Sequence, residues 1–281
     1  MLKGSLIFAA VALSPVLFGC SRSSTPESSV ASPQATGELF QQKSIGNFGL
    51  RGTKTVALTF DDGPVRDVTP KLLKFLEDER VTATFFMVGS NIPGNEDVLK
   101  RMSAGGFILG NHTYDHLQLR GPEFLSNPEK VIAQVEKTHD LIAPYLRGNQ
   151  RLYFRAPEGA WSATHAFTLN RIAKLRPYIG PIYWNIGGEL QPAPVRGAPY
   201  SVSESTIQSS ADWNCWEKNV SVKVCLAGYL NEIEAKHGGV ILMHDKTQNT
   251  LQMVRLLVPE LKRRGYEFVN MDQLKSLDQF E

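Results

Sequence analysis

Short apolar runs alternate with amphipathic segments over most of the chain. Runs rich in β-branched and aromatic residues predict buried strands, and apolar residues that recur every three or four positions predict helices. The predicted strands are Thr55–Phe60, Ala83–Val88, Phe107–Leu109, Leu152–Phe154, Tyr178–Trp184, Val240–Met243 and Glu267–Val269. The predicted helices begin near Thr69, Glu96, Pro128, His165, Leu226 and Leu251. Repeated strand–helix units predict an α/β protein, and about seven parallel strands fit a distorted (β/α) barrel with the active site at its C-terminal rim.

The N-terminus has the pattern of an export signal. Residues 1–20 carry one lysine and an apolar run that is too short for a membrane-spanning helix, which indicates a secretory signal peptide. The run ends at Leu17-Phe18-Gly19-Cys20, which resembles the lipobox of bacterial lipoproteins. The resemblance implies a lipidated Cys20 and an exported, membrane-anchored protein, which would lie in the outer membrane or periplasm if the cell is Gram-negative. Phe18 is bulkier than that pattern prefers, so ordinary cleavage, or a buried Cys20 in an uncleaved anchor, are the alternatives.

Composition divides the rest of the chain into two parts. Residues 21–47 are rich in Ser, Pro, Thr and Gln, which predicts a disordered tether, and residues 48–281 are long enough for one domain with a sizeable core. The net charge of +2 and the scattered basic residues argue against a nucleic-acid partner, and we expect a monomer. With Cys20 assigned to the lipid, Cys215 and Cys225 remain, and in an exported protein this pair predicts a disulfide.

Two adjacent carboxylates end the first predicted strand of the domain. The sequence Thr59-Phe60-Asp61-Asp62-Gly63-Pro64 takes an apolar strand directly into a turn, at the end of the sheet where α/β proteins keep their chemistry. Successive side chains of a strand point in opposite directions, so the two acids would have different functions or share a cation. The alternative is a solvated Asp-Gly turn.

Further polar residues come after other predicted strands. His112 and His116 are four apart, so both can point at one ion from a helical turn. With one carboxylate they make a three-ligand set with a position left for water, as in catalytic zinc sites. Arg155 and His244 also come directly after apolar strands. The alternatives are hydrogen-bonded core or surface residues.

Taken together, these segments resemble the motif series of a known family. Thr59 to Pro64, His112-Thr113-x-x-His116, Arg155-x-Pro157-x-Gly159 and Leu242-Met243-His244-Asp245, in this order, look like the polysaccharide deacetylases, the NodB-homology or family-4 carbohydrate esterases. The resemblance covers roughly residues 54–274. It implies a metal-dependent hydrolase that removes N-acetyl groups from an aminosugar polymer and releases acetate.

The resemblance also implies roles for individual residues. Asp62, His112 and His116 would hold a divalent metal ion, with Zn2+ the first choice, and Asp61 would be the base, oriented by Arg155. His244 would be the acid that protonates the departing amine. Asp212 would keep His244 charged, Trp213 and Leu242 would form an apolar wall for the acetyl methyl group, and the main-chain N–H of Glu158 would bind the oxyanion.

Two features depart from the family pattern. An aromatic residue usually stands where this chain has Glu158, which would change the substrate preference. The Asp-Trp motif expected soon after the fifth strand is missing there, and Asp212-Trp213 appears only after an insertion that we expect to be a long ordered loop fixed by the disulfide. Asn185 or Glu189 is the alternative partner of His244.

The polymer is not specified by these motifs. Peptidoglycan is the first choice because a lipid anchor would keep the enzyme close to it. The alternatives are exported poly-N-acetylglucosamine, chitin oligomers or, less favoured, acetylxylan as substrate, and a catalytically silent lipoprotein that binds the cell wall.

Overall fold

The structure is a computed structural model that describes Met1 and residues 39–280. The strands in this part of the chain are β1 (Phe40–Ile45), β2 (Thr55–Asp61), β3 (Thr84–Met87), β4 (Ile108–Asn111), β5 (Leu152–Tyr153), β6 (Tyr178–Ile182), β7 (Gly238–His244) and β8 (Glu267–Val269). The α-helices are α1 (Thr69–Asp78), α2 (Glu96–Ala104), α3 (Pro122–Ser126), α4 (Lys130–Ile142), α5 (Ala163–Asn170), α6 (Asp212–Glu217), α7 (Val222–Lys236) and α8 (Gln248–Arg263). The seven predicted strands are all present, although their ends shift by a few residues.

All strand pairs are parallel and form two sheets. One sheet has the order β4-β3-β2-β7 with β8 beside β2, and the other has the order β1-β6-β5. Isolated parallel bridges join the sheets on both sides, at Asn111 with Phe154 and at Ile186 with Ile241. The strands therefore take the course of the predicted distorted (β/α) barrel, with single bridges in place of continuous ladders where the sheets meet.

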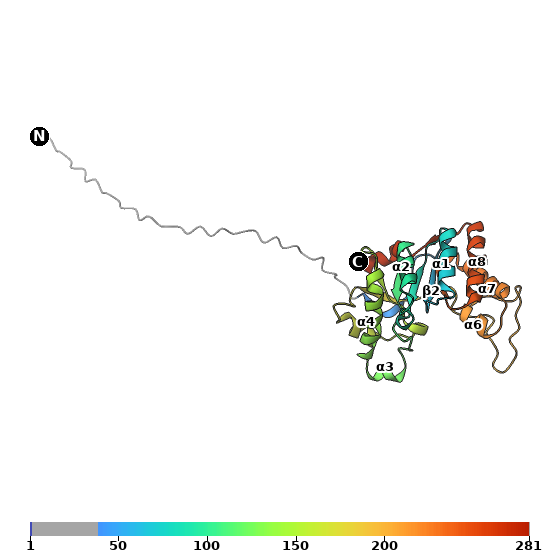
Figure 1. Cartoon of the computed structure of the whole chain (residues 1–281), viewed down its shortest axis with the longest axis horizontal. Coiled ribbons are helices and arrows are strands. Elements are labelled where there is room, and N and C mark those ends of the chain that lie inside the picture. The colour runs from blue at the N-terminus through green and yellow to red at the C-terminus, as the bar shows by residue number, and fades with distance from the viewer. Residues whose placement is uncertain (2–38, 281) are drawn as a thin grey trace. The chain divides into compact units, whose positions relative to one another are not determined.

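Strand β2 lies at the centre of the larger sheet, and its sequence explains why. Residues 56–60 are fully buried, as expected for a strand covered on both faces. On the outside, α7 packs against α8, α8 against α1, and α1 against α2. Figure 1 shows α7 and α8 on one side of β2 and α2 and α4 on the other, with α1 next to the strand. Since β2, β3, β4 and β7 run in the same direction, the polar residues directly after them reach one rim.

The predicted tether is wrong at its C-terminal end. Residues 40–45, which we assigned to the tether, form strand β1 against β6. Phe40 is buried, its N–H donates to Asn170 Oδ1 over 3.1 Å, and its carbonyl accepts from Asn170 Nδ2 over 2.9 Å. A segment with only two large apolar residues carries little strand signal, and its order comes from these distant partners. Cys20 and the rest of the predicted signal peptide and tether up to residue 38 lie outside the described residues.

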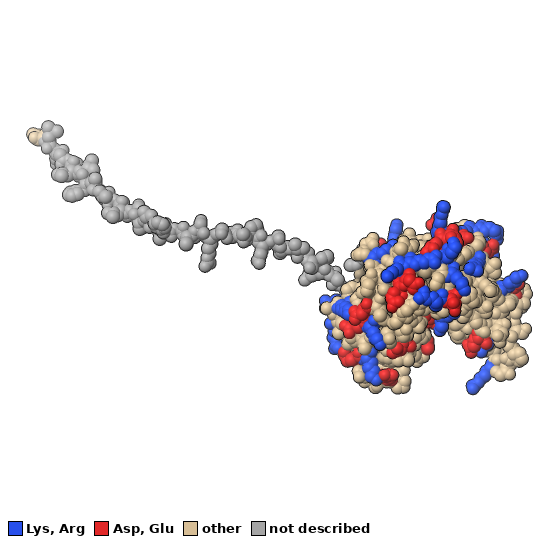
Figure 2. Space-filling model, viewed as in Figure 1, with Lys and Arg blue, Asp and Glu red and all other residues tan. Residues whose placement is uncertain are grey.

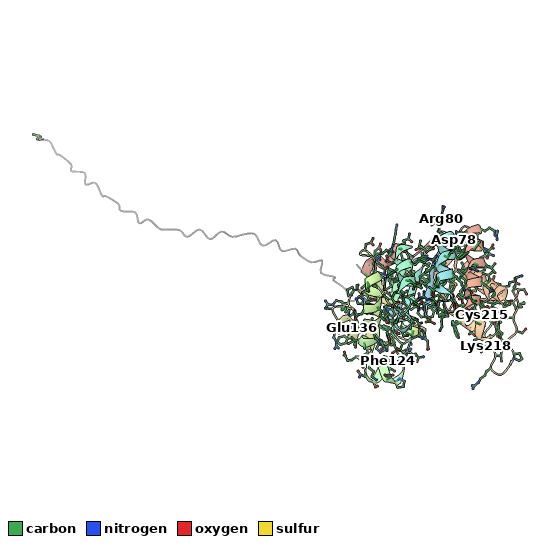
Figure 3. All side chains as sticks on the ribbon, viewed as in Figure 1. Asp78, Arg80, Phe124, Glu136, Cys215 and Lys218 are labelled. Carbon is green, nitrogen blue, oxygen red and sulfur yellow. A yellow bond between two sulfur atoms is a disulfide. The ribbon has the colours of Figure 1, made fainter. Side chains whose placement is uncertain are left out.

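The insertion after β6 is more regular than predicted. Gln191 and Ser209 form an antiparallel bridge across its irregular part, and the segment ends in helix α6, which begins at Asp212. The predicted disulfide is confirmed, because Cys215 of α6 (Figure 3) is bonded to Cys225 of α7. The insertion is therefore tied to a helix that packs on β7.

The described surface carries charges of both signs. Figure 2 shows basic and acidic side chains interspersed on the visible face, in agreement with the small net charge. Among residues 39–280, no helix combines the length and the apolar composition needed to cross a membrane.

Candidate active site

A cleft of about 750 Å³ opens at the C-terminal ends of the barrel strands. Figure 2 shows the surface hollowed between the parts that carry α3 and α6. The cleft is lined by Asp61, Asp62, His112, His116, Glu158, Tyr183, Trp184, Gly188, Asp212, Trp213, Trp216, Leu242, His244, Lys246, Thr247 and Thr250. Except for Arg155, which lies buried beneath it, every catalytic, metal-binding and substrate-binding residue that the sequence predicted lines this cleft.

Asp62, His112 and His116 form a group that fits a metal ion. Asp62 Oδ1 lies 3.0 Å from Nε2 of His116 and 3.5 Å from Nε2 of His112, and the three ligand atoms lie within 4.8 Å of one another. This oxygen is buried and has no well-oriented hydrogen bond from any described residue. An orphaned carboxylate oxygen facing two imidazole nitrogens is a donor set suited to zinc and to several other divalent ions.

The backbone turns these ligands toward one another. Asp62 has φ of 77° and His116 has φ of 56°, both in the left-handed region. Asp and His adopt this region more readily than most residues. The sequence pattern predicted a helical turn from His112 to His116, and this detail is wrong, because the segment is irregular after the end of β4.

A hydrogen bond fixes the orientation of His112. Its Nδ1 lies 2.8 Å from the carbonyl oxygen of Arg155. A carbonyl oxygen only accepts hydrogen bonds, so Nδ1 carries the hydrogen and the lone pair of Nε2 faces the cleft. Burial lowers the pKa of His112, and the nearby Asp61 and Asp62 charges only partly offset that effect. The ring is therefore kept in the neutral form that binds metals.

Asp61 forms a buried ion pair on the other side of the cluster. Its Oδ1 lies 2.7 Å from Nη1 of Arg155, which is fully buried. Arg155 also donates to Thr59 Oγ1 and to the carbonyl oxygens of Ile182 and Tyr183. Asp61 Oδ2 remains 3.6 Å from Nε2 of His112, so the carboxylate is held beside the metal-binding group with one oxygen directed toward it.

His244 is paired with Asp212. The imidazole Nδ1 lies 2.7 Å from Asp212 Oδ1, and the main-chain N–H of His244 donates to Asp212 Oδ2 over 2.9 Å. Burial lowers the pKa of His244, but the charge of Asp212 and its hydrogen bond outweigh this effect and raise the pKa to about 9. A charged imidazole therefore faces the cleft at neutral pH.

The alternative partners of His244 are engaged elsewhere. Asn185 donates to the carbonyl oxygen of Gly46 and accepts from the N–H of Val240, near the opposite end of β7. The carboxylate of Glu189 accepts from Gln191. The predicted contact between Asp212 and His244 is thus confirmed, and the insertion brings Asp212 back to the rim.

Sequence reasoning missed two residues that hold Asp212. Tyr229 of α7 accepts from the N–H of Asp212 over 3.0 Å and donates to the carbonyl oxygen of Leu242 over 2.9 Å. Thr250 of α8 donates to Asp212 Oδ2 over 2.9 Å. Gly187 leaves space for this arrangement, because a Cβ there would lie 2.9 Å from the Tyr229 ring. Nothing in the local sequence marks Tyr229 or Thr250, since both lie in ordinary helical patterns.

The remaining predicted residues form the walls of the cleft. Trp213 is 48% exposed, Leu242 is buried beneath the surface, and both line the cleft. Glu158 has φ of 54° and accepts from Gln118 Nε2 over 2.7 Å. Sequence reasoning also missed Tyr183, an exposed aromatic residue of this cleft.

Known proteins share this sequence pattern and this fold. The family model described as Polysaccharide deacetylase matches residues 49–174. The peptidoglycan-N-acetylglucosamine deacetylase PgdA of Listeria monocytogenes is 30% identical over 79% of this chain and 39% of its own length, so this chain spans about two fifths of that relative. A peptidoglycan-N-acetylglucosamine deacetylase of Bacillus cereus is 30% identical over 78% of this chain and 67% of its own. The solved structure of Bacillus subtilis PdaA, a family 4 carbohydrate esterase, has a TM-score of 0.61 at 23% identity and covers 84% of this chain and 86% of its own.

Proposed function

We propose that this chain, which belongs to the polysaccharide deacetylase family, removes N-acetyl groups from N-acetylglucosamine-type sugars of a cell-wall polymer and releases acetate. The observation that carries the proposal is the placement of two ion pairs in one cleft. Asp61 with Arg155 lies on one side of the candidate metal ligands, and His244 with Asp212 supplies a charged imidazole in the same cleft. An amide needs both a base for the attacking water and an acid for the amine that leaves, and this arrangement provides one of each.

Each residue has a defined part in the proposed mechanism. A divalent cation held by Asp62, His112 and His116 would polarise the acetyl carbonyl and lower the pKa of the attacking water. Asp61, held by Arg155, accepts the proton of this water. The main-chain N–H of Glu158 donates to the oxyanion of the tetrahedral intermediate. His244 then gives its proton to the nitrogen as the carbon–nitrogen bond breaks, and Asp212 keeps the imidazole charged until that moment.

Acetate release tests the proposal. Purified protein supplied with Zn2+ and N-acetylated chitotetraose should release acetate, and the His112→Ala variant should not. Titration of the metal-free protein with Zn2+, Co2+ and Ni2+ then identifies the ion that gives the highest turnover. A wild-type protein that binds the metal but leaves every acetyl group in place would support the alternative of a silent, wall-binding lipoprotein.

Peptidoglycan is the substrate that we propose first. Relatives that are 30% identical over 78–79% of this chain are named for peptidoglycan. A protein anchored at the membrane would have that polymer within reach. Exported poly-N-acetylglucosamine and chitin oligomers are the second candidates. Parallel assays on purified peptidoglycan and on both other polymers decide between them by the ratio of their kcat/KM values.

We also propose that the protein is an exported lipoprotein, with residues 1–20 as signal peptide and Cys20 as the lipid attachment site. Native protein recovered from membranes should carry the mass of a lipid on an N-terminal Cys20, and the Cys20→Ala variant should leave the membrane fraction. Membrane-bound wild-type protein without this mass would refute the anchor.

A further inference from the structure

One corner of the cleft contains an aromatic surface that the proposed mechanism does not use. Tyr183 comes directly after β6, lines the cleft and is 38% exposed. Its ring stacks on the ring of Trp184, with centroids 4.0 Å apart and planes 18° from parallel. An exposed ring supported from behind by a second ring is a flat apolar surface in a fixed orientation, which suits the apolar face of a sugar.

Two glycines allow the main chain to pack closely against this aromatic pair. A Cβ at Gly159 would lie 2.8 Å from the ring of Tyr183, and a Cβ at Gly188 would lie 2.4 Å from Nε1 of Trp184. Both contacts are shorter than a side chain could make without movement. The two rings are thus held between main-chain segments, and the stacking surface is already formed in the structure.

A carboxylate lies next to this surface. Glu158 immediately precedes Gly159 and also lines the cleft. Its carboxylate accepts one hydrogen bond from the neutral amide of Gln118, and no ion pair to it is present within residues 39–280. Its negative charge is therefore available to a ligand in the cleft.

We propose that Tyr183 and Glu158 form a subsite for the neighbouring sugar of the polymer, and that this subsite favours an aminosugar whose amine is already free. This inference rests on the proposed function. The pyranose ring packs on Tyr183, and its ammonium group lies against the Glu158 carboxylate, where charge assistance strengthens the hydrogen bond. A sugar with a free carboxylate is repelled at the same place. The enzyme then works best beside a unit that has already lost its acetyl group.

Binding of a fully deacetylated glucosamine tetramer tests the subsite without turnover. Calorimetry at low salt should show affinity reduced about tenfold in Tyr183→Ala by loss of the stacking surface, and less in Tyr183→Phe. In Glu158→Gln we expect about a fivefold loss, corresponding to one ion pair near water, and it should disappear at high salt. The matched control is Phe167→Ala, because Phe167 is 61% exposed on α5 and does not line the cleft. It should bind as the wild type does.

The kinetic test compares chitotetraose with a tetramer that carries one free amine beside an acetylated unit. The wild type should prefer the second substrate, and Glu158→Gln should lose the preference, measured as the ratio of the kcat/KM values for the two substrates within each variant. The subsite is overturned if the tetramer binds unchanged to both Tyr183→Ala and Glu158→Gln, or if it does not bind to the wild type. Normal deacetylation in the same preparations would leave the proposed function standing. Binding that changes as expected in a wild type that releases no acetate would retain the subsite and refute the function.

Discussion

The pairing of Asp212 with His244 leads to a quantitative prediction for the Asp212→Asn variant. Asparagine has nearly the same shape and removes the charge. Its one amide oxygen can still accept the hydrogen bonds made to one of the two carboxylate oxygens, whereas its amide nitrogen cannot accept those made to the other. The charge and hydrogen bond of Asp212 raise the pKa of His244 to about 9, whereas burial acts in the opposite direction. Without the carboxylate, the pKa should fall to the ordinary 6.5 or below.

The sign of the effect is set by the acid role of His244. A raised pKa means that the charged imidazole is present below pH 9 and is lost as the pH rises through that value. At pH 7.5 the wild-type ring is almost fully charged, while a ring with a pKa of 6.5 is about one-tenth charged, so activity should fall about tenfold or more. Below pH 6 the variant should recover much of this loss.

The assay is the pH dependence of kcat/KM for acetate release. We expect the alkaline limb of the profile to move from near pH 9 in the wild type to pH 6.5 or lower in Asp212→Asn. Metal content is measured at each pH so that loss of the ion is not mistaken for loss of the acid, and circular dichroism confirms folding. An alkaline limb that stays in place would show that Asp212 does not control the protonation of His244.

Three further predictions concern the metal ligands, strand β1 and the disulfide. Asp61→Asn should keep its metal and lose nearly all turnover, whereas His112→Ala should lose the metal. If elemental analysis found no metal in Asp61→Asn, the assignment of Asp61 as base and not as metal ligand would be wrong. A protein that starts at residue 47 lacks the buried Phe40 and its strand. Its free energy of unfolding in urea should therefore be about 3 kcal/mol or more below that of a protein that starts at residue 38. Equal midpoints of urea unfolding would mean that β1 adds no stability. Replacing both cysteines of the α6–α7 disulfide by serine should lower the free energy of unfolding by about 3 kcal/mol. It should also move the alkaline limb of the pH profile in the same direction as Asp212→Asn, since α6 carries that residue. A profile identical to that of the wild type would show that Tyr229 and Thr250 suffice to hold Asp212 in place.

Much of the candidate site could be predicted because its residues come directly after apolar strands. Asp61 and Asp62 lie at the end of β2, and His112 at the end of β4, so the direction of parallel strands brings them to one rim whatever the details of packing. Arg155 could be predicted in the same way, but its burial and its hydrogen bonds to Thr59, Ile182 and Tyr183 could not, because these partners come from separate strands.

The displaced Asp-Trp motif shows where sequence reasoning needed the structure. The sequence left three candidate partners for His244, because spacing alone does not determine where a long insertion returns. Packing decided among them, since Tyr229 and Thr250 hold Asp212 beside His244 while Asn185 bonds to Val240 and Gly46.

The sequence by itself determined the order of the seven predicted strands, the end of the barrel where the chemistry lies, and the residues of the proposed metal site, because these depend on periodicity and on the residues at the end of each strand. Only the tertiary structure decided that residues 40–45 form a strand, that Asp212 reaches His244, and that Tyr183 is exposed beside Glu158. Each of these depends on contacts between residues far apart in the chain, and such contacts leave little trace in local sequence.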